Sequence, residues 1–254
     1  MKGCLKHPLR VTGRLIWLGG EFAYAGLDFI FHRYFAADKC PPEATKAKIV
    51  QIHSRRILRV IKAGVKVAGP IPASGLLVTN HSSYLDILVL GSLTPAVFVA
   101  KREIKSWPVF GWLTSLAGTV YVNREKRIHA GQTAQQIETT LHSGVLVILF
   151  AEGTSSNGQA VLPFKSSLLE PATRHPHSLS VGWLQYAIDD GDVVEEVCYW
   201  KDMTLVPHLI NLLSKRSVRI TVRLAHVNNG SPDRKVLARQ LHAEVSKLKD
   251  AIAD

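Results

Sequence analysis

The feature that most constrains the fold is an alternation of short apolar segments with helical segments from residue 65 onward. Seven segments rich in apolar and β-branched residues predict strands, at 75–79, 96–100, 118–122, 145–150, 179–183, 196–200 and 218–227. Helices are predicted between them, most clearly at 129–142 and 203–214, and a last helix follows Ser231 and Pro232. Strands separated by helices predict an α/β fold, a layered αβ sandwich around a mostly central sheet.

Length and cysteine content limit the number of domains and the role of metals. The chain has 254 residues, of which 46% are hydrophobic and 20% charged, which is typical of a folded protein with one large core. The cysteines, Cys4, Cys40 and Cys198, are too scattered for a disulfide framework and form no Cys-x-x-Cys pair. We therefore expect no structural metal.

The first 64 residues are predicted to form a basic helical motif ahead of an αβ domain over residues 65–254. Residues 1–70 contain 13 Lys and Arg against 4 Asp and Glu, so they carry nine of the eleven net positive charges. An apolar run over residues 15–31 is interrupted by Glu21 and Asp28, which are seven positions apart and share one helical face. These acids argue against a membrane span. The pattern favours an interfacial or half-inserted helix with its acids facing protein or water, and an ordinary core helix is the alternative.

A second basic helix is expected over residues 43–63, after Pro41 and Pro42. Its isoleucines recur at helical spacing, and cations such as Arg55, Arg59 and Lys62 occupy much of the remaining surface. Such a helix binds anionic lipid, although a solvated surface gives the same pattern. A non-enzymatic nucleic-acid-binding module is the alternative from another class. The cations alternate with Ile, Leu and Trp and no nucleic-acid motif is present, so no nucleic-acid partner is predicted.

His81 and Asp86 are the strongest candidates for catalysis. They follow the buried apolar segment 76–78 and stand five positions apart, which on a regular helix would leave their side chains about 140° apart. They meet only if His81 lies on the turn before a helix and Asp86 lies in its first turns, an entry for which Ser82 and Ser83 are suitable caps. A carboxylate bonded to an imidazole fixes its tautomer and makes it a general base.

Two further segments have motifs in a recognisable order. Residues 101–112 are basic and contain Pro and Gly, and the following segment, 118–124, ends in Arg124. Glu152, Gly153 and Thr154 follow the apolar strand predicted at 145–150. Together with the His-x-x-x-x-Asp pair, these segments make residues 75–200 resemble the lysophospholipid acyltransferase (PlsC-like, 1-acyl-sn-glycerol-3-phosphate acyltransferase) family.

The resemblance implies a membrane-associated O-acyltransferase of phospholipid and glycerolipid biosynthesis. Its acceptor would be a lysolipid hydroxyl, and its donor an acyl thioester on acyl carrier protein or coenzyme A, with no other cofactor. His81 would remove the hydroxyl proton while the oxygen attacks the thioester carbonyl, so no acyl-enzyme forms. The family also implies the αβ sandwich with a preceding helical motif, and attachment at the cytoplasmic face of the inner or plasma membrane, next to anionic lipid.

The remaining candidate site residues bind substrate. Arg124 resembles the family arginine that binds an anionic headgroup, which a guanidinium can hold through two parallel hydrogen bonds. Glu152 would orient Arg124 or the acceptor, and Gly153, beside Thr154, would let a ligand approach the backbone. Main-chain N–H groups from Lys105 to Gly111 are candidate donors to the tetrahedral oxyanion.

The chain departs from the family pattern at Ser155. Members that form phosphatidic acid commonly have an arginine directly after Glu-Gly-Thr, and this chain has Ser155 there. The change favours an acceptor with less negative charge than a phosphate monoester, such as lyso-ornithine or another aminoacyl lysolipid, while Lys165 is a possible substitute cation. The sequence leaves two classes of acceptor open: 1-acylglycerol-3-phosphate or a related lysophospholipid, and lyso-ornithine or another aminoacyl lysolipid.

Overall fold

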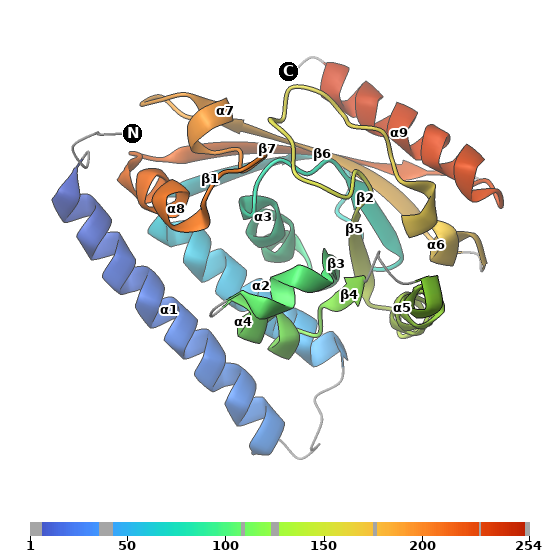
Figure 1. Cartoon of the computed structure of the whole chain (residues 1–254), viewed down its shortest axis with the longest axis horizontal. Helices are drawn as coiled ribbons and strands as arrows, with labels where there is room; N and C mark the ends of the chain where they lie inside the picture. The colour runs from blue at the N-terminus through green and yellow to red at the C-terminus, as the bar shows by residue number, and fades with distance from the viewer. Residues whose placement is uncertain are drawn as a thin grey trace.

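A seven-stranded sheet organises the molecule (Figure 1). The computed structural model describes residues 7–35, 43–107, 110–122, 127–174, 177–228 and 230–251, with the backbone alone over 127–134. The strand order is β1-β7-β6-β2-β5-β3-β4. The strands are β1 (Ala63–Ala68), β2 (Leu76–Thr79), β3 (Ala96–Lys101), β4 (Val120–Val122), β5 (Leu146–Phe150), β6 (Leu179–Ala187) and β7 (Val218–Val227).

Helices cover both faces of this sheet. The longer ones are α1 (Pro8–Tyr34), α2 (Glu43–Val60), α3 (Leu85–Leu93), α5 (Arg127–His142), α8 (Leu205–Ser214) and α9 (Arg234–Asp250). The shorter ones are α4 (Phe110–Leu116), α6 (Glu170–Arg174), α7 (Val193–Glu196) and the 3₁₀ helices η1 (Arg102–Ser106) and η2 (Ser166–Leu168). One core cluster joins the sheet to α1, α2, α3 and α8, and a second joins its other face to α5, α6 and α9.

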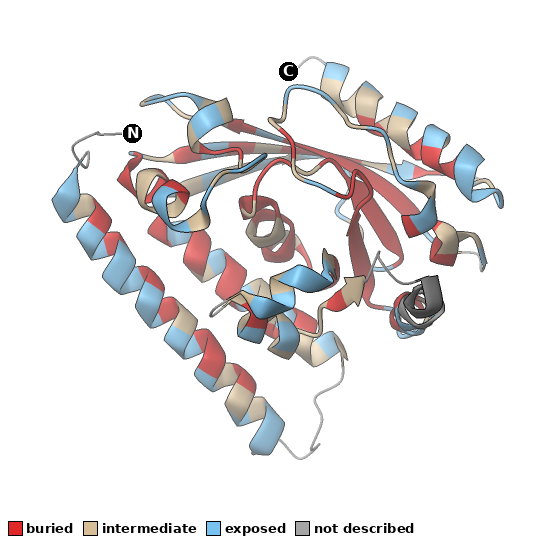
Figure 2. Ribbon diagram, viewed as in Figure 1, coloured by how far each residue is buried: buried red, intermediate tan, exposed pale blue. Residues whose placement is uncertain are grey.

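Alternation along the strands explains these two layers. Leu76 and Val78 of β2 lie in the cluster with α9, whereas Leu77 between them lies in the cluster with α3. Side chains of a strand point alternately to opposite faces, so a strand covered on both faces is apolar throughout. All residues of β2 and β5 are buried, as Figure 2 shows for the centre of the sheet.

Strand direction places the candidate motifs at one edge. Five adjacent strands run parallel to one another: β4, β3, β5, β2 and β6. The next strand, β7, runs antiparallel to β6. The segments that contain His81, Lys105, Arg124 and Glu152 follow β2, β3, β4 and β5 respectively. In open α/β sheets this carboxyl edge is where ligands bind.

The predicted α/β fold is confirmed, and one predicted strand is wrong. Residues 196–200 do not join the sheet, because α7 ends at Glu196 and the residues after it form irregular structure. Their backbone bonds to the loop after β2 instead: Tyr199 N–H donates to the Ser82 carbonyl at 2.8 Å. The apolar pattern at Val197 and Cys198 reflects burial beneath that loop.

Polar contacts attach α1 to the rest of the protein. Arg14, which is buried, donates to the carbonyls of Leu213 and Lys215 at the end of α8, at 3.0 and 2.5 Å. Two bonds of 2.6 and 3.0 Å join the Arg56 guanidinium of α2 to the Glu21 carboxylate.

Asp28 of α1 likewise bonds to His53 of α2, at 2.9 Å. Both acids that interrupt the apolar run of α1 therefore face protein. The predicted division between residues 64 and 65 stays a prediction; it falls within β1, and side chains of α1 and α2 share a core cluster with the sheet.

The opposite side of α1 is apolar and exposed. Ile16, Leu27 and Phe31 are 73%, 64% and 57% exposed. Further exposed apolar residues on or beside this helix are Leu9, Trp17, Tyr24, Tyr34, Phe35 and Trp112 of α4. We call these nine residues the outer apolar face; the exposed stripes of α1 are visible in Figure 2. Within the described part of the chain, no helix combines the length and hydropathy that crossing a membrane requires.

Candidate functional site

His81 and Asp86 form a hydrogen-bonded pair, as the sequence predicted. The distance from His81 Nδ1 to Asp86 Oδ2 is 2.7 Å. A carboxylate only accepts hydrogen bonds, so the imidazole donates from Nδ1 and its Nε2 keeps the lone pair. The His81 side chain is 20% exposed and the Asp86 side chain fully buried. The pair therefore presents a basic nitrogen supported by a buried negative charge.

Four donors hold the Asp86 carboxylate. Besides His81, the main-chain N–H groups of Ser82 and Ser83 donate to Oδ2 at 2.8 and 3.0 Å. The Tyr186 hydroxyl of β6 donates to Oδ1 through a short bond. A buried carboxylate without partners is strongly destabilising, so these donors fix both its position and its charge.

The sequence folds in this way because β2 ends directly before the pair. The Asn80 amide extends the pairing of β2 with β6: its Oδ1 accepts from Leu184 N at 2.8 Å and its Nδ2 donates to Leu184 O at 3.1 Å. The chain then turns through His81 into α3, as predicted. The expected serine cap is met in part: Tyr84 occupies the N-cap position, but Ser83 Oγ accepts from the Leu85 N–H at 3.3 Å and donates to the Val197 carbonyl at 2.7 Å.

Two contacts from β5 and the loop after it hold His81 in place. The imidazole stacks on the Phe150 ring at 4.1 Å between centroids and 20° between planes. The Ser156 N–H donates to the His81 carbonyl at 2.9 Å, and the Ser156 hydroxyl donates to the same oxygen at 3.2 Å. The ring can thus turn little about its bond to the chain. Sequence reasoning missed Asn80, Phe150, Ser156 and Tyr186, since none belongs to a motif.

Glu152 lies beside this pair and is 1% exposed. Its Oε1 accepts from Leu162 N at 3.2 Å. Burial is the main cause that raises the pKa of Glu152 to about 8, and the nearby Asp86 charge raises it further. Glu152 is therefore a neutral carboxylic acid at pH 7, which can donate a hydrogen bond as well as accept one. The Asp86 charge and a hydrogen bond from the His81 backbone both act on this carboxyl, so Glu152 lies near the pair, and its role in binding stays a prediction.

The residues after Glu152 form a tight turn. Gly153 has a φ of 72°, a conformation that favours glycine, and its N–H donates to the Phe150 carbonyl at 3.0 Å. Thr154 is exposed and Ser155 half-buried. This exposure leaves both side chains available to a ligand at the sheet edge.

The segment after β3 includes Lys105 in η1. The Lys105 ammonium lies 5.8 Å from the centroid of the Tyr121 ring. A side chain at Gly111 would come within 2.1 Å of the Lys105 carbonyl, so only glycine fits there. The N–H groups of Trp107 and Gly111 donate to the carbonyls of Ile104 and Trp107. These two donors are engaged locally, and an oxyanion site in this segment stays a prediction.

Arg124 lies outside the described residues. The strand before it, β4, ends at Val122 and runs parallel to β3, so it leads to the same edge as the His81 loop. The headgroup role of Arg124 is therefore still a prediction from the sequence.

Cys198 is a poor candidate for a nucleophile near this pair. The thiol is 1% exposed and donates to the Asn157 carbonyl at 3.3 Å. Burial, followed by the Asp86 charge, raises the pKa of Cys198 to about 12. A thiol becomes nucleophilic as the thiolate, so this group is inert at neutral pH.

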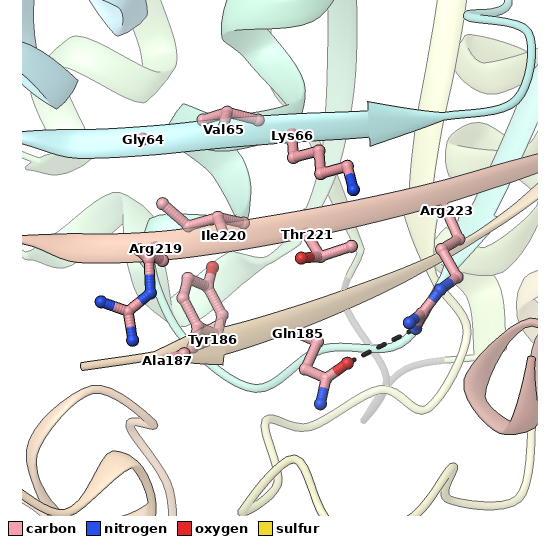
Figure 3. A pocket seen from close by; sticks show the side chains of 10 residues that line it. All are labelled: Gly64, Val65, Lys66, Gln185, Tyr186, Ala187, Arg219, Ile220, Thr221 and Arg223. Atoms are coloured by element: carbon pink, nitrogen blue, oxygen red, sulfur yellow. Dashed lines mark hydrogen bonds between the residues drawn. The ribbon is translucent and has the colours of Figure 1, made fainter. Parts of the chain in front are cut away.

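A groove of about 480 Å³ lies elsewhere, over β1, β7 and β6 (Figure 3). Its polar lining includes Lys66, Gln185, Arg219 and Arg223. Arg223 there donates to Gln185 Oε1 at 3.4 Å and to the Leu248 carbonyl of α9 at 3.5 Å. The groove is on the α9 side of the sheet, whereas Asp86 lies on the α3 side.

Comparisons with known proteins show the family to which the chain is similar. The sequence profile of the Acyltransferase family matches residues 64–209. A lyso-ornithine lipid O-acyltransferase of Brucella abortus is 31% identical over 221 residues, covering 80% of this chain and 82% of the relative. A 1-acyl-sn-glycerol-3-phosphate acyltransferase of Neisseria meningitidis is 31% identical over 218 residues, covering 84% and 85%.

The fold also has a solved counterpart. The crystal structure of the 1-acyl-sn-glycerophosphate acyltransferase PlsC of Thermotoga maritima superimposes with a TM-score of 0.66, covering 97% of both chains at 18% identity. This likeness includes the region of the N-terminal helices as well as the sheet.

The raised pKa of Glu152 predicts a pH dependence of stability. Between the ordinary value of 4.5 and about 8, the folded protein keeps a proton that the unfolded chain has lost. The free energy of unfolding therefore falls as the pH rises through this window. Glu152→Gln removes the titrating group, so from pH 5 to pH 8 the variant should lose less stability than the wild type, by on the order of 4 kcal/mol.

Urea unfolding at both pH values measures this difference. Glu103→Gln, at an exposed carboxylate of η1, is the matched control and should follow the wild type. Equal pH dependence of Glu152→Gln and the wild type would show that Glu152 is ionised in the folded protein.

Proposed function

This chain belongs to the acyltransferase family, and we propose that it transfers a fatty acyl group from an acyl thioester to the free hydroxyl of a membrane lysolipid. The observation that carries the proposal is the His81–Asp86 pair at the carboxyl edge of the sheet, with an imidazole nitrogen left basic at a partly exposed position.

The proposed mechanism is direct attack by the lysolipid hydroxyl. His81 Nε2 takes the hydroxyl proton as the oxygen attacks the thioester carbonyl, and the Asp86 carboxylate stabilises the imidazolium that forms. The tetrahedral intermediate collapses with loss of the thiolate, which a thiol pKa of about 8.5 makes a good leaving group. The imidazolium then returns its proton to that thiolate. The unreactive thiol of Cys198 is consistent with a mechanism in which no acyl-enzyme forms.

The acyl donor is proposed to be acyl carrier protein or coenzyme A carrying the chain as a thioester. Both donors present the same reacting group, and the proposed chemistry at His81 does not distinguish them. The proposed acceptor is 1-acylglycerol-3-phosphate or a related lysophospholipid, or lyso-ornithine lipid, all of which occur among the names of the relatives.

We further propose that the outer apolar face docks on the membrane surface, at the cytoplasmic leaflet. The charged groups Arg14, Glu21 and Asp28 of α1 are bound to α8 and α2, which leaves apolar and aromatic side chains outward. An exposed apolar face of this size is typical of a surface that contacts a membrane or another protein.

In this proposal, the basic residues in and directly after α2 contribute unequally to docking. Arg56 is paired with Glu21, and the Arg55 Nε donates to the Ser92 carbonyl at 2.7 Å. Arg59 and Lys62 are exposed and are the better candidates for contact with anionic lipid.

The general-base proposal predicts that His81→Ala lowers kcat by about 10²- to 10⁴-fold. Asp86→Ala should be similarly inactive, because the imidazole loses its orientation and its counter-charge. Acyl transfer by the purified protein to lysolipid in mixed micelles measures the effect, and circular dichroism checks the fold. His226→Ala, at an exposed histidine of β7, is the matched control and should retain full activity. A His81→Ala variant with a tenth of wild-type turnover would exclude His81 as the base.

The missing cation at Ser155 predicts the acceptor preference. We expect lyso-ornithine lipid to be used with a higher kcat/KM than lysophosphatidic acid. Ser155→Arg should raise kcat/KM for lysophosphatidic acid by roughly tenfold, since an arginine–phosphate hydrogen bond contributes about 1.5–3 kcal/mol. Gln159→Arg adds the same charge at an exposed position of the same loop and should have little effect.

The same assay tests Arg124. Arg124→Ala should chiefly raise the KM for lysolipid, and Arg124→Lys should restore only part of the loss because the two-point geometry is gone. Strong turnover of lysophosphatidic acid alone by the wild type would contradict the preference inferred from Ser155.

The docking proposal predicts that the triple substitution Ile16→Glu, Leu27→Glu and Phe31→Glu weakens vesicle binding by at least about 100-fold, because each apolar side chain contributes roughly 1.5–3 kcal/mol when buried. Co-sedimentation with neutral and anionic vesicles measures it. Val236→Glu, at an exposed apolar position of α9, is the control and should bind normally. Arg59→Gln with Lys62→Gln should weaken binding to anionic vesicles alone. Unchanged sedimentation of the triple variant would show that this face is not the membrane contact.

A further inference from the structure

Tyr186 lies outside every sequence motif, yet its hydroxyl contacts the catalytic pair. We propose that Tyr186 is a positioning residue: its hydroxyl holds the Asp86 carboxylate and sets how strongly that carboxylate attracts a proton on His81. The inference rests on the proposed role of His81 as the general base.

The two oxygens of Asp86 are held from different sides. Oδ2 receives His81 Nδ1 and the two N–H groups of Ser82 and Ser83, all from the loop before α3. Oδ1 receives the Tyr186 hydroxyl, which is 100 residues further along the chain. Tyr186 thus connects the loop of the pair to the middle of the sheet, and its bond prevents the carboxylate from rotating away from His81.

The position of Tyr186 is determined by β6. The residue pairs in register with Ile220 of β7 and is 6% exposed. Its neighbour Gln185 is exposed, and Figure 3 shows the two side chains leaving β6 on opposite sides. The groove on the Gln185 side is therefore separated from Asp86 by the sheet. Because the hydroxyl is fixed by the sheet, it acts as a preformed donor instead of a group that must be recruited.

The chemical effect of this donor follows from charge. Burial raises the pKa of Tyr186 well above its ordinary value of 10, with a further contribution from the Asp86 charge, so the phenol stays protonated. A hydrogen bond from a neutral phenol stabilises the carboxylate and reduces the charge that faces His81. Without this hydrogen bond, the Asp86 carboxylate would attract the imidazolium proton more strongly. His81 would then lose that proton, and act as a base, only at higher pH.

Other titratable groups near the pair do not produce the same effect. Glu152 follows β5, Cys198 follows α7 and Tyr84 precedes α3. The pKa of Glu152 is raised to about 8 and that of Cys198 to about 12, in both cases chiefly by burial. Burial also raises the pKa of Tyr84. Below about pH 7 all three are therefore mainly uncharged, and the acid side of the pH profile reports the His81–Asp86 pair.

The test is the pH profile of kcat/KM for Tyr186→Phe, which removes one oxygen and keeps the ring. The acid limb of this profile, where activity rises with pH, should move to higher pH by roughly half to one unit. The kcat should fall about tenfold, while the KM for lysolipid changes little. Tyr84→Phe is the matched control, since it also removes a buried hydroxyl that bonds a histidine, His208, at 3.0 Å. Its acid limb should coincide with that of the wild type.

A second variant keeps the test independent of packing. Incorporation of 3-fluorotyrosine at position 186 makes the phenol more acidic and a stronger donor, so the acid limb should move to lower pH, opposite to Tyr186→Phe. A merely structural tyrosine would not give shifts of opposite sign.

Two outcomes overturn the inference: an unshifted acid limb in both variants, or a shift of the same sign in both. If His81→Ala is inactive and either outcome occurs, only the role of Tyr186 fails. Substantial activity of His81→Ala would instead remove the proposed function on which this role rests.

Discussion

The buried Asp86 carboxylate is the group on which the rest of the site depends. Its side chain is fully buried, where an ionised carboxylate is stable only if hydrogen-bond donors replace water. Those donors are His81, the backbone of Ser82 and Ser83, and Tyr186. The requirement to satisfy this one charge therefore determines the path of the loop, the tautomer of the imidazole and the contact between α3 and β6.

The site can form because parallel strands from separate parts of the sequence end at the same edge of the sheet. β2 leads to His81 and β5 leads to Glu152, and the two strands are hydrogen-bonded neighbours. The loop after β5 then closes on His81 through Ser156. In α1, Arg14, Glu21 and Asp28 bond to other helices, whereas Ile16, Leu27 and Phe31 are exposed. A membrane-bound acceptor and a donor from solution would meet at such a site.

The sequence predicted the parts of this protein whose structure follows from local pattern. β7 was predicted correctly because apolar and polar residues alternate along part of it, and β2 because it is a continuous apolar run, as a strand covered on both faces requires. The pairing of His81 with Asp86 was predicted from the His-x-x-x-x-Asp motif of the family, and the five-residue spacing indicated that His81 would lie on the turn before the helix.

What the sequence could not predict depends on contacts between distant residues. Tyr186 lies three residues past the predicted end of its strand, and its partner is 100 positions away. Asn80 completes the pairing of β2 with β6 through a side-chain amide, which no periodicity reports. The segment 196–200 resembles a strand because Val197 and Cys198 within it are buried against the loop of the pair. In each case tertiary packing, which has no local signal, decides the structure.

In the proposed mechanism, the lysolipid hydroxyl attacks the thioester directly while His81 removes its proton. The most direct test is intact-protein mass spectrometry of the enzyme after incubation with whichever acyl thioester supports turnover, in the absence of acceptor. Direct attack predicts that the protein mass is unchanged at times when a complete reaction would have turned over many times. An acyl-protein adduct that forms at one per chain and passes its acyl group to added lysolipid would contradict it.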